Sequence, residues 1–353
     1  MFSDFICTPP NAASTAEQFS ELFTGPTPFK PAPDWVQIKH NPVRDVFKKD
    51  SWYIKVDHRK FHTFKHEFNM ALALKRHGIP VVEHLLCART GTENFLITAE
   101  LKNSIPAGDF LDSPADKTNF IAALTGFMEQ WQNTPFEHTD PHFGNLLYIP
   151  ETNRLFLVDV HDIKQRFFPC RCRKDIARFI FNLRGRVPYR TIIDLMTKFQ
   201  IAEPEKSFCS MMQKEFARIK KEWQKRKKQL FDAYPKFSYR KDNWLICTPY
   251  KEISASLPAE FTADAQAEFA ASTFLNLLQI PHRRCVAVDL QNNMVKRTEK
   301  LSALPNDEES AMFTQVLALC GFTASPGQYR LYNDTAALDE ISGVAKSPLF
   351  KEG

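Results

Sequence analysis

The spacing of apolar and polar positions changes along the chain. Near the N-terminus, short apolar runs are separated by turn-prone residues, which is typical of strands; these runs are residues 35–38, 43–47 and 52–56. A helical pattern follows at residues 61–77 and is ended by Gly78, with Pro80 beyond it. The pattern therefore predicts a small sheet followed by one helix.

The second part of the chain is predicted to be mainly helical. Residues 94–101 form a further apolar strand, and residues 118–132 have a strong helical pattern. Residues 145–149 and 154–160 are predicted to be two strands joined by a turn. The pattern is helical again from Lys174 onward. A strand-rich part with one helix, followed by a helical part, predicts two lobes with a nucleotide in the cleft between them.

Length and composition agree with a soluble protein of about two domains. The chain has 353 residues, of which 43% are hydrophobic and 25% charged. No apolar run reaches the roughly eighteen residues of a membrane span. Residues 1–33 do not have the pattern of a signal peptide and are predicted to be a loosely ordered arm. The eight cysteines are scattered, and Cys170 and Cys172 lack zinc-ligand spacing, so reduced thiols in a cytoplasmic protein are expected.

The net charge of +5 conceals two basic clusters. Residues 164–190 hold nine Lys or Arg against one Asp, and residues 214–228 hold eight against two Glu, which leaves −9 for the rest of the chain. Such clustering indicates an anionic partner. The second cluster surrounds an apolar stripe that is expected to pack on the helical lobe. Its cationic flanks also suit peripheral contact with an anionic inner-membrane surface, at about 1 kcal/mol per basic residue. No nucleic-acid-binding fold is recognisable.

The candidate chemistry is concentrated in residues 138–161. Asp140 is followed five residues later by Asn145, and Asp159 comes fourteen residues after that. A phosphoryl-transfer site needs one carboxylate to orient and deprotonate a hydroxyl, and an Asn and an Asp to hold Mg²⁺ on the nucleotide. The predicted turn at 150–153 folds two strands back on each other, so Asn145 and Asp159 can converge. His138 is expected to support the loop backbone.

Two further residues complete the set. Lys55 is a polar residue within an apolar strand, and it is a candidate for the lysine that pairs with the α- and β-phosphates. Glu67 shares a helix face with Phe64, Met70 and Leu74, where a carboxylate is costly unless it is paired. Lys55, twelve residues upstream, is its expected partner.

These motifs carry a resemblance to a known superfamily. The catalytic-loop motif His138-Thr139-Asp140 with Asn145 resembles that of the protein-kinase-like phosphotransferases. Asp159-Val160-His161 and the basic segment 171–177 are similar to motifs of the bacterial lipopolysaccharide core heptose kinases. The resemblance covers residues 34–235.

The resemblance implies an α+β, protein-kinase-like bilobal fold: a small antiparallel β-sheet lobe with one helix (34–101), a larger mainly helical lobe (102–235) and a C-terminal mixed α/β extension (236–353). It implies an ATP- and Mg²⁺-dependent kinase with Asp140 as catalytic base. Lys55, Glu67, Glu100 and Leu101 would contact or position the nucleotide, and Asn145 and Asp159 would hold the metal. The implied acceptor is a lipopolysaccharide core sugar or another anionic glycolipid.

Two features depart from the pattern. Residues 40–44 occupy the place of the glycine-rich loop without a single glycine, and Asp162 has no counterpart. Other interpretations also stay open. The acceptor could be a small alcohol such as an aminoglycoside or choline, or the chain could be an inactive pseudokinase. His138, Asp140, His142 and His161 could instead form a zinc-dependent hydrolase site. The sequence does not determine the oligomeric state.

Overall fold

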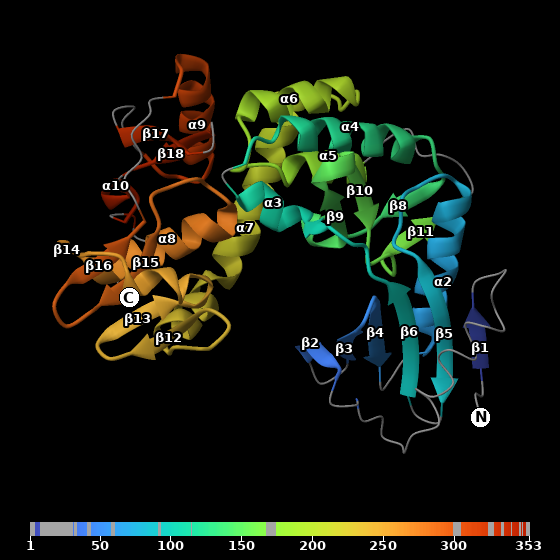
Figure 1. Cartoon of the computed structure of the whole chain (residues 1–353). Coiled ribbons are helices and arrows are strands. Elements are labelled where there is room, and N and C mark those ends of the chain that lie inside the picture. Colours follow the sequence, from blue (N-terminus) through green and yellow to red (C-terminus); the bar gives the residue numbers. More distant parts are fainter. Residues whose placement is uncertain are drawn as a thin grey trace. The chain divides into compact units, whose positions relative to one another are not determined.

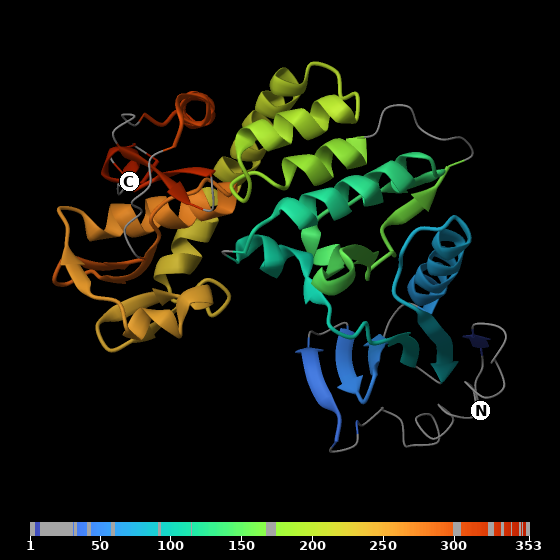
Figure 2. The same ribbon diagram turned by 45° about the horizontal axis from the view of Figure 1, so that its top comes forward.

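The computed structural model divides the chain into two compact units, residues 1–179 and 180–353, which Figures 1 and 2 show from two directions. The structure describes residues 4–7, 31, 34–40, 44–57, 61–90, 93–113, 115–166, 174–298, 305–323, 328–332, 335–339, 341–345, 347 and 349–350. The glycine-free loop 41–43 and residues 167–173 in the first basic cluster lie outside the described residues.

The first unit begins with a six-stranded antiparallel sheet in the order β1-β5-β6-β4-β3-β2. Its strands are β1 (Asp4–Cys7), β2 (Val36–His40), β3 (Arg44–Lys49), β4 (Trp52–Asp57), β5 (His84–Thr90) and β6 (Glu93–Ala99). The predicted strands at 35–38, 43–47, 52–56 and 94–101 correspond to β2, β3, β4 and β6. Residues 4–7, expected within a loosely ordered arm, instead pair with β5, because that edge of the sheet offers unpaired backbone groups.

The two faces of this sheet carry different side chains because successive residues of a strand point to opposite faces. One face forms an apolar core that includes Phe47, Ile54 and Val56. Helix α2 (Phe61–Arg76) packs on the other face, where Phe64 and Phe68 join the core. The helix ends at Arg76, and Gly78 follows as the predicted stop, with a φ of 75° that suits a residue without a Cβ. The hydrogen bond from Ile79 N to Leu74 O closes this end.

The rest of the first unit is built from helices and short strand pairs around the candidate loops. Its elements are β7 (Ile105–Pro106), α3 (Ala107–Asp112), α4 (Thr118–Gln132), β8 (Phe136–His138), η2 (Phe143–Asn145), β9 (Leu146–Ile149), η3 (Pro150–Thr152), β10 (Arg154–Leu157), β11 (Ile163–Gln165) and most of α5 (Lys174–Phe181). β9 pairs antiparallel with β10 across the predicted turn. The short antiparallel pair β8–β11 brackets the segment that holds the metal-binding candidates.

The second unit holds the remaining helices and a five-stranded antiparallel sheet in the order β12-β13-β15-β16-β14, with a separate β17–β18 hairpin. Its elements are α6 (Tyr189–Lys198), α7 (Pro204–Phe231), β12 (Ser238–Lys241), β13 (Trp244–Cys247), η4 (Thr248–Tyr250), η5 (Ile253–Ala255), β14 (Ala259–Phe261), α8 (Ala265–Leu278), β15 (Cys285–Asp289), β16 (Met294–Arg297), α9 (Asp307–Leu319), β17 (Tyr329–Tyr332), β18 (Thr335–Leu338) and α10 (Ser342–Ala345).

The apolar stripe of α7 is buried within this unit. Met212, Ile219 and Trp223 are each at most 1% exposed, and the Trp223 ring meets Phe274 of α8 edge-on at 4.9 Å. The stripe therefore packs against protein.

The fold class agrees with the prediction. A small antiparallel sheet with one helix is followed by a mainly helical part and then by a mixed α/β portion, which is the α+β arrangement that was predicted. Among the helices of the described residues, none is both long and apolar enough to cross a membrane.

Candidate active site

A cavity of about 650 Å³ lies in the first unit, between the sheet and the loops that follow it. Its volume is within the range of small-molecule sites. Six of the seven predicted site residues line it, and the seventh, Glu67, is bonded to one of them. The lining set is Lys55, Glu100, Leu101, Asp140, Asn145 and Asp159. Residues from four separate segments of the chain therefore meet at one cavity.

Lys55 and Glu67 form the expected ion pair. Lys55 Nζ donates to Glu67 Oε1 at 2.6 Å, from the cavity face of β4 to the inner face of α2. The Glu67 side chain is fully buried, whereas the Lys55 side chain is 14% exposed. This pair fixes the position of the Lys55 ammonium group at the wall of the cavity.

The surroundings of Glu67 keep it ionised. Burial would raise the pKa of Glu67, but the Lys55 charge and the neighbouring His84 ring outweigh burial and lower it. His84 Nε2 lies 3.7 Å from Glu67 Oε1, and His84 Nδ1 contacts the carbonyl oxygen of Val82. Sequence reasoning missed His84, because a histidine at the start of an apolar strand gives no signal of this contact.

Asp159 lines the same cavity close to the Lys55–Glu67 pair. Its Oδ1 is 3.9 Å from Lys55 Nζ, and it accepts a hydrogen bond from His161 Nδ1. Burial would raise the pKa of Asp159, but the His161 hydrogen bond and the charges of Lys55 and Arg44 hold it well below its usual range. Asp159 is therefore ionised at neutral pH and keeps its second oxygen for a ligand.

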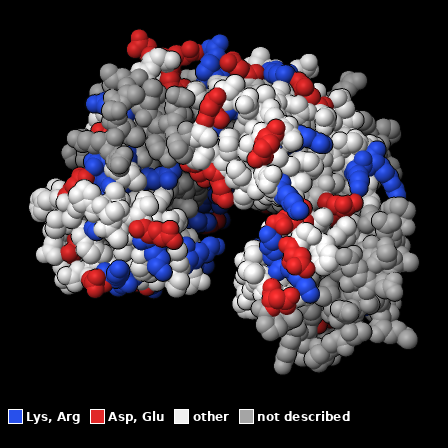
Figure 3. Space-filling model, viewed as in Figure 1, with Lys and Arg blue, Asp and Glu red and all other residues white. Residues whose placement is uncertain are grey.

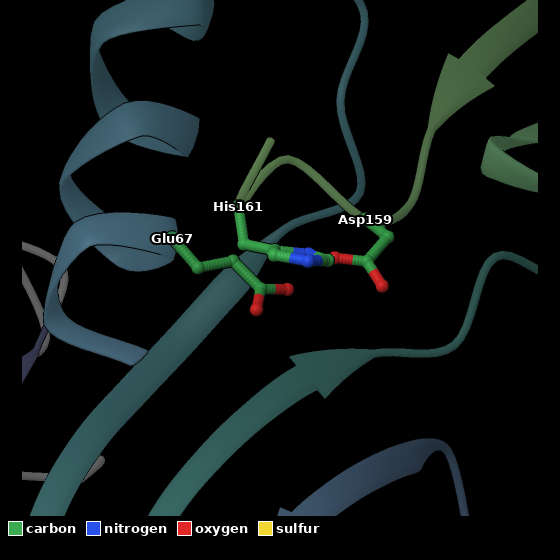
Figure 4. Close-up of side chains that lie close together, drawn as sticks. All are labelled: Glu67, Asp159 and His161. Atoms are coloured by element: carbon green, nitrogen blue, oxygen red, sulfur yellow. The ribbon is translucent and has the colours of Figure 1, made fainter. Parts of the chain in front are cut away.

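The oxygens of Glu67 and Asp159 and the ring of His161 lie within 4.8 Å of one another. In Figure 4 the His161 ring points at the Asp159 carboxylate from the same loop, and Glu67 approaches from α2. His161 Nε2 also lies 3.1 Å from Asp162 Oδ2. Asp162, which has no counterpart in the motif, is thus placed beside the His161 ring. The hydrogen bond with Asp159 raises the pKa of His161 against the effect of burial.

Asn145 supplies a second oxygen at the cavity wall. Its Nδ2 donates to the carbonyl oxygen of Asp140 at 3.2 Å, which leaves Oδ1 available as an acceptor. Its backbone carbonyl accepts from Val158 N at 3.1 Å, next to Asp159. Asp159 and Asn145 thus offer a carboxylate and an amide oxygen to the same cavity, and both are oxygen ligands that suit Mg²⁺.

Asp140 lies at the mouth of the cavity. Its side chain is 60% exposed, and its Oδ2 is 3.5 Å from His142 Nε2. The backbone N–H of Asp140 donates to His138 Nδ1 at 3.3 Å, so His138 supports the loop as expected. Burial lowers the pKa of His138 to about 4, so the ring is neutral and can accept this bond.

Asp175, which the sequence indicated only as part of the segment 171–177, anchors the loop that holds Asp140. Asp175, at the start of α5, is 4% exposed, and its Oδ2 accepts from Trp131 Nε1 at 2.8 Å and from His138 N at 3.2 Å. A buried carboxylate with these donors fixes the backbone just before Asp140. The signal that could have found it is an acid flanked by the apolar residues of an amphipathic helix.

Glu100 and Leu101 follow β6 at the other end of the cavity. Glu100 N donates to Ser51 O at 2.7 Å, and the Glu100 side chain pairs with Lys48 at 2.5 Å. The Glu100 amide is thus engaged in the protein. Leu101 O accepts from Ser104 Oγ at 2.6 Å, which shapes the turn after the strand.

The described members of the first basic cluster are largely engaged by the protein. Arg166 pairs with Glu137, and Arg178 Nη1 donates to the carbonyl oxygen of Thr139 at 3.3 Å. In the second unit, Arg184 is 4% exposed and bonds to Leu278 O, and Arg190 pairs with Glu308. Figure 3 shows basic and acidic side chains intermingled on the visible face of the first unit. These arginines have structural partners already.

The hydrolase interpretation is not supported. Among the described residues, Glu67, Asp159 and His161 form the group of acids and histidines close enough to share a metal. His138 is buried and bonded to a backbone amide, so it does not join His142 and His161 around one ion.

Comparison with known proteins gives distant matches in structure. No family model and no curated protein sequence matches the chain. The bifunctional kinase-methyltransferase WbdD is 13% identical over 48% of this chain, with a TM-score of 0.35, and the match covers 46% of that chain. The aminoglycoside phosphotransferases APH(2'')-IIa, in a complex with streptomycin and ATP, and APH(2'')-Ib, bound to ADP, are each 11% identical. They cover 58% and 59% of this chain and 87% and 90% of theirs, with TM-scores of 0.41 and 0.40. The match thus spans about half the length of WbdD, and overall likeness at these scores assigns no activity.

Proposed function

We propose that the chain is an ATP- and Mg²⁺-dependent phosphotransferase that acts on an alcohol. The observation that carries this proposal is the buried Lys55–Glu67 pair beside Asp159, at a cavity whose mouth presents Asp140. A fully buried carboxylate that holds a lysine at a cavity wall costs desolvation energy. That cost is explained if the lysine has to be placed accurately against an anionic ligand.

Each residue has a role in the transfer. Lys55 binds the phosphates, and Asn145 and Asp159 would hold Mg²⁺, which supplies charge neutralisation on the phosphate oxygens. Asp140 orients the acceptor hydroxyl and takes its proton as the new oxygen–phosphorus bond forms. The bond between the γ-phosphorus and the bridging oxygen breaks, and ADP leaves. The exposed position of Asp140 leaves room for an acceptor.

For the acceptor we propose an anionic glycolipid, most specifically a sugar of lipopolysaccharide core. The support is the basic run that follows Asp159, in which Lys164 and Lys174 are exposed. A specific observation favours a second candidate, a small cationic acceptor such as an aminoglycoside. Asp140 and Asp162, at 60% and 42% exposure, present negative charge at the mouth of the cavity.

Peripheral contact with an anionic membrane is a further part of the proposal. The exposed Lys220, Lys221 and Lys225 of α7 support it, since their helix turns its apolar side inward. Arg218 and Arg226 contribute less, because each pairs with Glu222 on the same helix.

The test is transfer of labelled γ-phosphate from ATP to a panel of lipopolysaccharide cores, aminoglycosides and proteins. Label on a core sugar supports the glycolipid acceptor, and label on an aminoglycoside supports the second candidate. The control is Asp140→Ala, which must lose the transfer. Transfer that persists in this variant would refute the assignment of Asp140.

A further inference from the structure

Lys39 occupies an unusual position in the cavity. It lies on β2, in the strand that precedes the sequence position of a glycine-rich loop, and it lines the cavity. The sequence of β2 does not predict that Lys39 faces a cavity, because the alternation of Val36 and Ile38 with polar residues does not indicate which face of the strand lines it. The structure shows how Lys39 reaches the cavity.

An irregularity in the pairing of β2 with β3 sets the face of Lys39. Gln37 is opposite Phe47, but Lys39 is opposite Val46, so β2 has one extra residue between these pairs. In a regular ladder Ile38 would lie opposite Val46. The bulge places Lys39 there instead and leaves Ile38 53% exposed. A bulge of this kind re-aims a side chain, and bulges are frequent beside active sites.

Side-chain contacts confirm the change of face. Gln37 Nε2 and His40 Nδ1 both contact the same oxygen, Asp45 Oδ1, at 3.3 and 2.6 Å. Residues three apart in a regular strand point to opposite faces. Gln37 and His40 can share one partner because the extra residue lies between them, and Lys39 is left on the cavity face.

Lys39 lies level with Lys55 across the sheet. Val46 is opposite Lys39 on one side and opposite Lys55 on the other, so the three residues form one row across β2, β3 and β4. Two strand spacings separate the lysines, or about 10 Å between backbones. Tyr53, two residues before Lys55 on β4, also lines the cavity. It is paired with Thr98, so it lies toward the Glu100 end of the cavity, whereas Lys39 lies beside Lys55. Lys39 is therefore at the phosphate level of the site.

The charges that line the cavity leave Lys39 available to a ligand. The acids of the lining are Glu100, Asp140, Asp159 and Asp162; Glu100 is paired with Lys48, and Lys55 is paired with Glu67. Among the described residues Lys39 forms no ion pair. An ammonium group that lines the cavity and has no carboxylate partner among the described residues can pair with an anionic group of a ligand.

We propose that Lys39 binds the phosphate chain of the nucleotide, so that a side-chain cation does the work that backbone amides do in a glycine-rich loop. This inference rests on the proposed function, because it assigns the same cavity to a nucleoside triphosphate. Lys39 then binds phosphate, and the base of the nucleotide binds at the end of the cavity near Glu100.

The test compares the affinities of ATP, ADP and adenosine by calorimetry on the full chain with Mg²⁺. Lys39→Met is expected to weaken ATP and ADP about tenfold, the value of one charge-assisted contact, and to leave adenosine within about twofold. Lys39→Arg should keep most of the affinity. The matched control is Lys49→Met, because Lys49 lies on the same sheet and contacts Asp34 and Trp35 away from the cavity.

The outcomes separate the two proposals. If the wild-type chain does not bind ATP, the proposed function fails and the inference fails with it. If the wild-type chain binds ATP and Lys39→Met binds it equally well, only the inference is overturned. Equal losses for ATP and adenosine would also overturn it, because they would indicate a change in cavity shape. Loss for ATP and ADP alone, with Lys49→Met unchanged, supports it.

Discussion

Removal of the Lys55 charge tests the buried pair at the centre of the site. In Lys55→Met the Glu67 carboxylate, 0% exposed, loses its partner at 2.6 Å. Breaking a buried pair by removing one partner typically costs about 3–5 kcal/mol, against about 0–1 kcal/mol for an exposed pair. We expect about 3 kcal/mol at pH 8, because Lys55 is itself 14% exposed and His84 lies 3.7 Å from Glu67 Oε1.

The loss should depend on pH in a defined direction. In the wild-type chain the pKa of Glu67 is lowered, so its contribution is present above the unfolded pKa and is lost as the pH falls through the folded pKa. Without Lys55, burial dominates and raises the pKa of Glu67, so the sign reverses. The variant should then lose stability as the pH rises above about 4.5, the ordinary value.

The assay is hydrogen exchange of peptides that cover β4 and α2, measured at pH 5 and pH 8 after correction for the intrinsic rate. It reads the first unit separately from the second, which a single unfolding curve does not. A loss of about 3 kcal/mol raises exchange about 100-fold. Lys55→Met/Glu67→Gln should recover part of the loss, because the uncompensated charge is gone. A loss below about 1 kcal/mol at pH 8, or no recovery in the double variant, would refute the reasoning.

Three further predictions concern the loops around the cavity. Asp140→Ala and Asp159→Ala should each abolish transfer of labelled phosphate without unfolding the chain, and only Asp159→Ala should lose Mg²⁺-dependent ATP binding; wild-type activity in Asp159→Ala would sink the metal assignment. Asp175→Ala leaves Trp131 Nε1 and His138 N without their hydrogen-bond acceptor, so the loop before Asp140 should lose its anchor. We expect kcat to fall at least tenfold while ATP affinity, measured by calorimetry, stays unchanged. An unaltered kcat would contradict the anchoring role of Asp175. The pKa of His138 is lowered to about 4, so its contribution to stability is present above pH 6.5 and is lost as the pH falls toward 4. His138→Asn should remove that part of the pH dependence in exchange measurements, and an identical profile would count against a neutral buried ring.

Much of the fold followed from local patterns. Strand and helix patterns predicted β2, β3, β4, α2 and β6 to within a few residues, because apolar runs and the turn-prone residues between them are local features of the sequence. β1 and β5 were not predicted. β5 is as long as β6, but its apolar residues have no clear period, and β1 pairs along the edge of the sheet that β5 offers.

The site residues divide in the same way. Spacing alone indicated that Glu67 needs Lys55, since a carboxylate on an apolar helix face must be paired with a cation. Asp175 and His84 could not be assigned from spacing, because their partners, Trp131 and Glu67, come from distant segments.

The sequence by itself indicated the chemical set: one lysine, three acids and an asparagine in an order that suits phosphoryl transfer, on elements whose periods are local. The tertiary structure alone decided which cations are free to act. It showed the described arginines of the first basic cluster engaged by the protein, and it turned Lys39 into the cavity through one extra residue in β2. The reason is that face and partner depend on strand register and packing, which no single segment of the chain contains.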